Sequence, residues 1–292
     1  MSTNEHRGTA FVEEAEVVAH EGHPGEQFIL RVKAPRIAAA AEPGGFAHLR
    51  CAPLLPMRRP LSIMRTDAEG GDVEFLYKVV GEGTRLLSER AVGERISVLG
   101  PLGRPFAPSP GRTRPLLIGG GVGIPPMVFL ADRLRHVSET APFAILGSEV
   151  PFPFQPRPSQ YLVPGMPAGV TAAMPLLEDW SVASRLTSGR GFAGCHEGYV
   201  TDLARHWLEA LGPAGRAEVE VFACGPHPML EAVAALAREF DLPCQVSLEE
   251  FMACGVGGCA GCVVETKEGG TTAMRRVCVD GPVFDARDVF SG

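Results

Sequence analysis

The stretch RPLLIGGGVGIPPMVFLADRL, residues 114–134, sets two apolar runs on either side of a turn made almost wholly of glycine. The first run has the length of a buried strand and the second that of a helix, so the stretch predicts the opening of a βα unit. Glycines in such a turn let the backbone approach a pyrophosphate closely, and the start of the following helix favours its negative charge. The run is not the GxGxxG fingerprint, so alone it also fits a merely tight turn.

The chain beyond this stretch continues the same pattern. Apolar strands at 142–147 and 218–224 alternate with helices at 199–211 and 227–240. This alternation predicts a parallel, doubly wound sheet. A second strand-to-helix turn, CGPHPM at 224–229, would lie at the same carboxyl edge of that sheet. The two turns together favour a nucleotide site over two tight turns.

The stretch from 150 to 198 is the exception. It is rich in proline, begins VPFPFQPRPSQYLVPG and shows little periodicity. So long an irregular segment is uncommon inside a compact domain, so it is either functional or contains elements that the pattern does not reveal.

Before the βα unit, the chain has a different character. Short strand-type runs separated by turn residues fill the first hundred or so positions, which predicts an antiparallel barrel or sandwich. We therefore predict a multidomain α/β plus β protein with three units: a β-barrel at 1–108, a doubly wound parallel α/β nucleotide domain at 109–242 and a small cysteine-bearing domain at 243–292. The barrel runs are FVEEAEVVA, EQFILRVKA, FAHLRC, PLSIMR, DVEFLYKVV and RISVLG.

Four cysteines of the last unit form a set. Cys254, Cys259 and Cys262 follow the Cys-x4-Cys-x2-Cys spacing, and Cys278 stands further along the chain. That is the spacing of plant-type ferredoxins, whose thiolates hold a [2Fe–2S] cluster, and the intervening glycines let the chain curl around it. The alternative is a structural zinc ion, but zinc sites usually pair their ligands as Cys-x2–4-Cys twice, or use histidine.

Composition limits the classes of function. The chain has 292 residues, 45% hydrophobic and 21% charged, which is ordinary globular composition. Its formal net charge of −7 argues against a nucleic-acid binder. The first residues show no secretory signal, and the most apolar stretch, at 116–131, is broken by glycine and proline and too short for a membrane span. We expect a soluble, cytoplasmic protein that binds neither nucleic acid nor membrane.

Two runs of the barrel also carry polar groups suited to a ligand. RPLSI at 59–63 offers the cationic fork of Arg59, and LYKVVGEGT at 76–84 offers glycine backbone and a threonine hydroxyl. On residue chemistry alone, a strand with an edge proline followed by a turn explains both equally well.

Together these motifs resemble those of one family. A barrel with RPLS and GEGT, then GGGVGIPP and CGPHPM, then the cysteine set and CVDGPVFDARDV, is similar to the electron-transfer subunit of class 1B dihydroorotate dehydrogenase, within the ferredoxin-reductase superfamily. The resemblance runs nearly end to end. It implies an NAD(H)-linked oxidoreductase of pyrimidine biosynthesis with FAD in the barrel, a [2Fe–2S] cluster, and a catalytic partner subunit that contains FMN, in a complex with two copies of each. A flavin suits the middle place because it exchanges both hydrides and single electrons.

The resemblance also implies site residues. FAD would contact two barrel segments, NAD(H) the two glycine turns and the GYVTD segment, and the cluster the four cysteines, with no catalytic acid or base. The residues carried over are Arg59, Pro60, Leu61, Ser62, Leu76, Tyr77, Lys78, Gly83 and Thr84 for FAD, Gly119, Gly120, Gly121, Gly123, Thr201, Asp202, Cys224, Gly225 and Pro226 for NAD(H), and Cys254, Cys259, Cys262 and Cys278 for the cluster.

One further contact follows from the residues themselves. Glu149 comes just after the predicted strand at 142–147, where the adenosine ribose should lie, and its carboxylate would repel a 2′-phosphate. NADH is therefore expected over NADPH, although 184–191 reads SRLTSGRG where relatives are acidic. A related NAD(P)H-linked reductase subunit serving a ferredoxin, sulfide or oxygenase-type acceptor would share these motifs, and a zinc-stapled binding module is the alternative that is not an enzyme.

Overall fold

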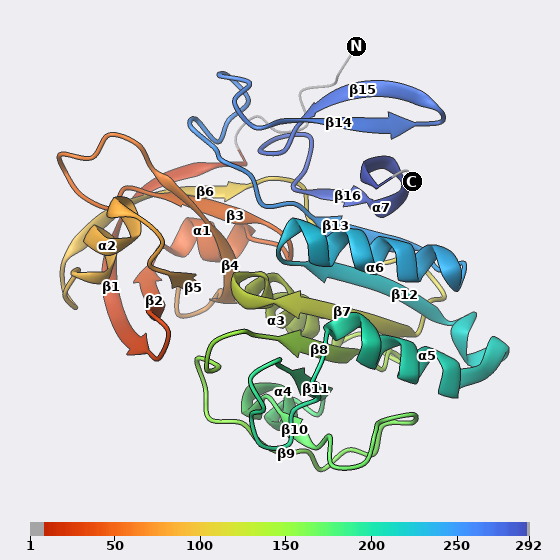
Figure 1. Ribbon diagram of the computed structural model, residues 1–292. Coiled ribbons are helices and arrows are strands. Elements are labelled where there is room, and N and C mark those ends of the chain that lie inside the picture. The colour runs from red at the N-terminus through yellow and green to blue at the C-terminus, as the bar shows by residue number, and fades with distance from the viewer. Residues whose placement is uncertain (1–8, 291–292) are drawn as a thin grey trace.

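The N-terminal third forms a closed antiparallel barrel in the computed structural model, which describes residues 9–290 except the side chain of Glu268 (Figure 1). Around the barrel the strands follow the order β1-β2-β5-β4-β3-β6. Closure leaves no open edge, and alternate side chains fill the interior. The strands are β1 Phe11–His23, β2 Gln27–Lys33, β3 Phe46–Leu49, β4 Arg59–Asp67, β5 Asp72–Lys78 and β6 Arg95–Leu102, with the short helices α1 Pro35–Ala40 and α2 Glu82–Ser88 between them.

The next part is a six-stranded sheet with the order β11-β8-β7-β12-β13-β16, of which only β16 runs antiparallel. The chain builds outward from β7 to β8 and β11, then returns to the other side of β7 with β12 and β13. The strand order therefore reverses between β7 and β12. The strands are β7 Arg114–Gly120, β8 Phe143–Gly147, β11 Ala183–Thr187, β12 Val219–Cys224, β13 Cys244–Ser247 and β16 Val283–Asp285. The barrel, the doubly wound sheet and the cysteine-bearing end confirm the predicted fold class.

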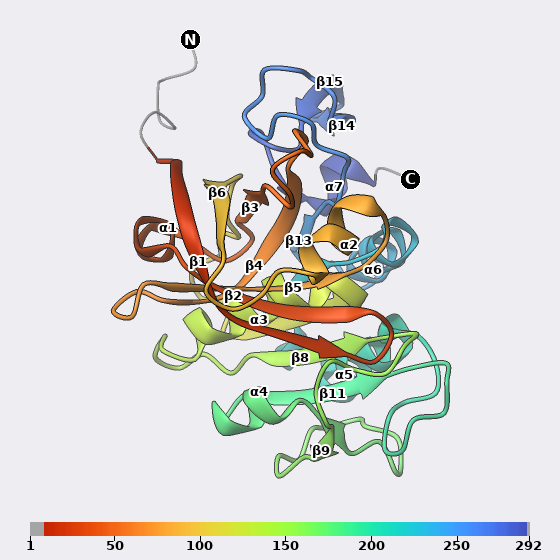
Figure 2. The same ribbon diagram turned by 90° about the vertical axis from the view of Figure 1, so that its left-hand side faces the viewer.

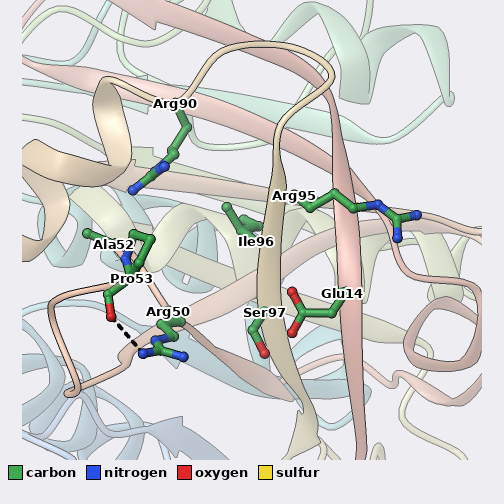
Figure 3. A pocket seen from close by; sticks show the side chains of 8 residues that line it. All are labelled: Glu14, Arg50, Ala52, Pro53, Arg90, Arg95, Ile96 and Ser97. Carbon is green, nitrogen blue, oxygen red and sulfur yellow. Dashed lines mark hydrogen bonds between the residues drawn. The ribbon is translucent and has the colours of Figure 1, made fainter.

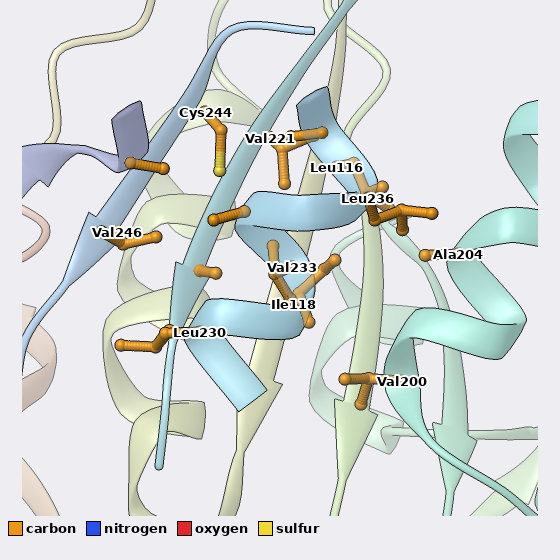
Figure 4. Close-up of a cluster of buried hydrophobic side chains, with 14 of the residues drawn as sticks. Leu116, Ile118, Val200, Ala204, Val221, Leu230, Val233, Leu236, Cys244 and Val246 are labelled. Atoms are coloured by element: carbon orange, nitrogen blue, oxygen red, sulfur yellow. The ribbon is translucent and has the colours of Figure 1, made fainter. Parts of the chain in front are cut away.

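Helices cover both faces of this sheet. On one face α5 Val200–Arg216 and α6 His227–Glu239 pack their apolar sides, and on the other α3 Ile124–Leu134 packs between the sheet and β4 of the barrel. Each fully buried aliphatic side chain contributes about 1.5–3 kcal/mol to such a core. Figure 4 shows the first of these two layers, with Val200, Ala204, Leu230, Val233 and Leu236 from the helices over Leu116, Ile118, Val221, Cys244 and Val246 from the strands.

The irregular stretch from 150 to 198 contains small elements. A two-stranded sheet, β9 Arg157–Pro158 and β10 Ala172–Ala173, precedes the short helix α4 Pro175–Asp179 and strand β11. All four are too short to show a period in sequence. The segment thus completes the edge of the parallel sheet.

The C-terminal part holds the cysteine segment, the hairpin of β14 Val263–Glu268 and β15 Thr271–Arg276, and the helical turn α7 Ala286–Val289. In Figure 2 this hairpin lies at the top of the view, above the six-stranded sheet, and β3 of the barrel also lies in the upper part. The predicted boundary at 242/243 falls just before β13, which pairs with β12 in the large sheet. The division into three units stays a prediction. Among residues 9–290, no helix is both long and apolar enough to cross a membrane.

Candidate functional site

The first glycine turn lies where the strand order of the sheet reverses. Gly119 on β7 pairs with Cys224 on β12. A Cβ on Gly123 would lie only 2.2 Å from the carbonyl oxygen of Cys224 and 2.5 Å from the nitrogen of Gly225. Glycine at 123 is therefore what lets the two turns approach so closely. In open α/β sheets such a switch point, at the carboxyl ends of the strands, is where ligands bind.

The other residues predicted to contact nucleotide lie around the same turn. A Cβ on Gly120 would meet the sulfur of Met229 at 2.5 Å, whereas a Cβ on Gly121 would have no atom within 4 Å. Gly121 has a φ of +56°, which glycine adopts without strain. Pro226 is the N-cap residue of α6. The turn is thus tightly packed against Met229 at Gly120 and has open space beside Gly121.

The start of α5 lies beside this turn. A Cβ on Gly147, the last residue of β8, would lie 2.8 Å from the Cγ1 atom of Val200. Asp202 Oδ2 accepts a hydrogen bond from the backbone nitrogen of Tyr199 at 2.9 Å, which caps the helix. Thr201 and Asp202 therefore lie at the carboxyl edge of the sheet, and Asp202 already has a structural partner.

Glu149 follows β8, the neighbour of β7, as the ribose argument requires. Its side chain is exposed, and its carbonyl oxygen accepts a hydrogen bond from Nε of Arg190 at 3.1 Å. Arg190 belongs to the segment 184–191, where the resemblance leads us to expect acidic residues. The backbone carbonyl of Glu149, the residue predicted to bind the ribose, is thus hydrogen-bonded to Arg190. The sequence did not indicate this contact.

In the barrel, the RPLS segment begins β4 and contacts the start of α2. Arg59, Pro60, Leu61 and Ser62 are all half-buried. A Cβ on Gly83 would lie 2.4 Å from Nε of Arg59, so the guanidinium rests directly on this glycine. The arrangement brings the two predicted FAD segments together, with a cation and a bare backbone on one surface.

The remaining predicted FAD residues have structural partners of their own. Leu76 and Tyr77 are almost wholly buried, and the Tyr77 hydroxyl hydrogen bonds to Nε2 of His20 at 2.8 Å. The Thr84 hydroxyl accepts from the backbone nitrogen of Val80 at 3.0 Å and so holds the turn before α2. Leu76 and Tyr77 therefore offer a ligand their backbone rather than their side chains, while Lys78 is half-buried.

The flavin segments lie next to the nucleotide turn. β5 contacts the 3-10 turn Gly121–Gly123, and α3 packs on β4. Leu76 belongs to the same apolar cluster as Ile124 and Met127 at the start of α3. Two cofactors held by these segments would therefore be neighbours.

The four predicted cluster cysteines differ in exposure. Cys262 and Cys278 are buried, Cys254 is half-buried and Cys259 is exposed. Arg276 fixes the loop that carries them, since its Nη1 donates to the carbonyl of Gly257 at 3.2 Å while its Nε contacts Asp280 at 3.1 Å. The cysteines thus lie on a braced loop with one side toward solvent.

Hydrogen bonds to the sulfur atoms suit these residues to binding metal. Burial alone would raise the pKa of the Cys254 thiol, but the amides of Val256 and neighbouring residues and the Cys259 thiol outweigh it and lower the pKa to about 6. A thiolate is the form that ligates metal. Burial and then a hydrogen bond with Cys262 raise the pKa of Cys278 to about 12, so that this thiol keeps its proton until a metal displaces it.

The four thiols form two pairs. Cys254 interacts with Cys259, and Cys278 with Cys262. Within residues 9–290, no three His, Cys, Asp or Glu side chains converge as the ligands of one ion would. A [2Fe–2S] cluster takes two protein ligands on each iron, and this pairing is compatible with one.

Two residues near these sites, Glu249 and His48, belong to no recognisable sequence motif. Glu249 places Oε1 4.0 Å from the Sγ atom of Cys224, which joins the second turn to the start of the cysteine segment. His48 on β3 packs against Gly255 in the cysteine loop. Both are contacts between positions far apart in the sequence, so no local pattern could have found them.

The barrel surface also has a hollow (Figure 3). It contains none of the predicted site residues, and Arg50 Nη2 donates to the carbonyl of Pro53 at 2.7 Å beside it. The positive charge there belongs to the barrel surface rather than to the predicted flavin contacts. Its lining residues are Glu14, Arg50, Ala52, Pro53, Arg90, Arg95, Ile96 and Ser97.

Comparison with known proteins places these features in context. Residues 249–290 match the family model described as the iron-sulfur cluster binding domain of dihydroorotate dehydrogenase B. The chain is 33% identical over 267 residues to the dihydroorotate dehydrogenase B (NAD(+)) electron transfer subunit of Desulforamulus reducens, covering 90% of this chain and 92% of that one. It is 38% identical over 258 residues to the subunit of the same name from Bacillus caldolyticus, covering 85% and 86%.

Among solved structures, the chain is similar to one of an NADH-dependent reduced ferredoxin-NADP oxidoreductase studied for flavin-based electron bifurcation. The TM-score is 0.75 at 30% identity, and the match covers 95% of this chain and 90% of that one. The ferredoxin reductase of a carbazole 1,9a-dioxygenase, at 23% identity and a TM-score of 0.57, shares the fold.

Proposed function

The chain belongs to the family of dihydroorotate dehydrogenase B electron transfer subunits, and on that premise we propose how its residues serve the transfer. It is an NAD(H)-linked oxidoreductase subunit of pyrimidine biosynthesis whose cofactors are FAD, a [2Fe–2S] cluster and NAD(H). When bound, these groups supply hydride exchange at the nicotinamide, one- and two-electron exchange at the flavin and one-electron exchange at the cluster. A cytoplasmic location is part of the same proposal.

One observation carries the assignment of residues: three candidate sites adjoin one another within one chain. The nucleotide turn contacts β5 of the barrel, and β3 of the barrel contacts the cysteine loop through His48 and Gly255. Electrons can pass between groups only when these are held close together. We therefore assign the glycine turns to NAD(H), the β4–β5–α2 surface to FAD and the four cysteines to the cluster, so that FAD lies in the middle.

The assignment of FAD to Arg59 gives the first testable prediction. Arg59→Ala should weaken FAD binding at least about tenfold, because a hydrogen bond to a charged group contributes roughly 1.5–3 kcal/mol. Fluorescence of released flavin measures the dissociation constant. Arg114→Ala is the matched control, since Arg114 lies at the start of β7, outside this surface, and pairs with Glu218. Unchanged FAD affinity in Arg59→Ala would show that the assignment is wrong.

The choice of nucleotide gives the second prediction. The wild-type protein should reduce its flavin faster with NADH than with NADPH, because the Glu149 carboxylate repels a 2′-phosphate. Glu149→Gln should narrow that preference, since it removes the negative charge and leaves Arg190 nearby. Stopped-flow rates of flavin reduction with both nucleotides measure the ratio.

Glu209→Gln, a change of an exposed acid on α5, is the control and should leave the ratio unaltered. Equal rates with NADH and NADPH in the wild type would contradict the prediction.

A partner subunit is proposed to cover the cysteine loop. Phe251 and Val256 expose 94% and 54% of their surface on either side of Cys254, and Leu54, in the loop after β3, exposes 97%. Large apolar side chains exposed together mark interaction surfaces. Since His48 places β3 against this loop, we infer that a catalytic subunit containing FMN docks here, in a complex with two copies of each chain.

A second candidate acceptor follows from the structural comparison. The ferredoxin-NADP oxidoreductase that the chain resembles has 30% sequence identity to it, close to that of the curated relatives. A related NAD(P)H-linked reductase subunit, serving a ferredoxin, sulfide or oxygenase-type acceptor, would have the same three sites. The two functions differ in the partner.

The isolated chain tests the assignment. It should reduce artificial dyes with NADH but should not oxidise dihydroorotate, because its described residues form no site assigned to an organic substrate. Oxidation of dihydroorotate by the isolated chain would overturn the proposal. Dye reduction without coupling to any catalytic subunit that contains FMN would favour the second candidate.

A further inference from the structure

His48 is a buried histidine without partners, next to the cysteine loop. Its side chain has no exposed surface, and within residues 9–290 neither Nδ1 nor Nε2 has a hydrogen-bond partner. Buried polar atoms in proteins nearly always find a partner, and leaving one unpaired is destabilising. The hydrogen-bond partner of the imidazole is therefore expected to be a group that is not part of the polypeptide.

The strand that carries His48 aims it out of the barrel. Side chains alternate along a strand, and Ala47 and Leu49 pack in the barrel core. Phe46, on the same side as His48, belongs instead to the apolar cluster that contains Cys262 and Cys278. His48 thus faces the cysteine segment.

The ring lies directly on the cysteine loop. A Cβ on Gly255 would come within 2.8 Å of Cε1, 2.9 Å of Nε2 and 3.0 Å of Nδ1 of His48. Gly255 follows the predicted ligand Cys254 and has a φ of +70°. Both the contact and the backbone conformation require glycine, so the loop is shaped to receive the imidazole.

The neighbouring strand, β4, carries the RPLS segment of the proposed FAD surface. His48 pairs across the sheet with Pro60 of the RPLS segment. The guanidinium of Arg58 donates to the backbone carbonyl of His48 at 3.2 Å. Burial and then the Arg58 charge lower the pKa of His48 to about 4, so the ring is neutral near pH 7 and has one N–H to donate.

We propose that His48 donates a hydrogen bond to a sulfur atom of the cluster and thereby raises the cluster's reduction potential. The inference rests on the proposed function, since it requires a cluster on the four cysteines. A hydrogen bond to sulfur stabilises the more negative, reduced state, and such bonds are among the factors that set iron–sulfur potentials. His48 would thus contact the cofactor itself and tune the potential of the cluster.

The test is the midpoint potential of the cluster, followed by EPR in an anaerobic redox titration. His48→Phe keeps a planar ring but removes the donor. The equilibrium constant for electron transfer from FAD to the cluster should fall about tenfold, which is about 59 mV for a one-electron couple. The FAD potential should not change. His23→Phe, at the far end of β1, is the matched control and should leave both potentials unaltered.

Variants that retain a donor separate hydrogen bonding from packing. His48→Gln and His48→Asn each present an amide N–H at the place of one ring nitrogen, and one of them should keep the wild-type potential. A loaded His48→Phe variant with an unchanged potential would overturn the inference. So would Gln and Asn variants that both shift as far as Phe.

A second measurement needs no variant and covers the case in which His48→Phe takes up no cluster. Wild-type protein labelled with 15N-histidine should show a 15N coupling in the pulsed EPR spectrum of the reduced cluster. A reduced-cluster signal without that coupling would contradict the role of His48 alone. Wild-type protein without acid-labile sulfide would instead contradict the proposed function.

Discussion

Cys262→Ala should abolish the cluster while leaving the flavin in place. The wild-type chain is expected to contain about two irons and two acid-labile sulfides, because four thiolates hold one [2Fe–2S] cluster. Cys262 is buried and accepts a hydrogen bond from the Cys278 amide at 3.4 Å, so no solvent-exposed group can replace its sulfur. Iron and sulfide analysis of the purified variant should give values near zero.

Retained function and a matched variant complete this test. FAD binds to the barrel, so Cys262→Ala should keep its flavin absorbance and its NADH-dependent dye reduction. Cys244→Ala removes an equally buried thiol from β13, outside the set, and should keep the full cluster. Full iron and sulfide content in Cys262→Ala would remove this residue from the ligand set, and bound zinc in the wild type would favour the structural alternative.

Gly123→Ala should have the next largest effect, on nucleotide binding. The new Cβ would lie 2.2 Å from the carbonyl oxygen of Cys224, which is backbone and cannot swing aside. The two turns must separate, at a cost of about 1–3 kcal/mol for overpacking. The KM for NADH in dye reduction should rise about tenfold or more, whereas cluster and flavin content should stay at the wild-type level.

A glycine outside the turn distinguishes this collision from the general effect of alanine at a positive φ. Gly111→Ala, before the start of β7, would place its Cβ in open space and costs only the strain of a φ of +81°, roughly 1 kcal/mol. Its KM should stay near that of the wild type. A Gly123→Ala variant with the KM of the wild type would show that NADH does not bind at the switch point.

Much of the fold could be predicted because its signals are local. Two turns, one at 119–123 and one at 224–226, each join an apolar strand to an apolar helix. Parallel βα units place both turns at one edge of the sheet. The cysteine spacing is also local, because all four residues lie within 25 positions, from 254 to 278. Helices α1 and α2, at six and seven residues, are too short to show an amphipathic period.

Other features depend on contacts between distant parts of the chain. The order of strands around the barrel follows from closure and not from any one run. β16 joins the sheet through antiparallel pairing with β13, more than thirty residues earlier. The contacts of His48 with Gly255 and of Arg190 with Glu149 likewise arise from tertiary packing. No local sequence pattern indicates contacts of this kind. The sequence therefore predicted which cofactors bind better than it predicted the residues that surround their sites.

The central claim is that electrons pass through this chain between its partner and NAD(H). The direct measurement is the reduction of the cluster, followed by EPR, and of the FAD, followed by absorbance. Both are recorded after the chain, the FMN-containing catalytic subunit and dihydroorotate are mixed anaerobically without NAD+. The reduced-cluster signal should appear and the FAD absorbance should fall, and added NAD+ should restore that absorbance as NADH forms. FAD that stays oxidised while the FMN of the partner is reduced would contradict the account.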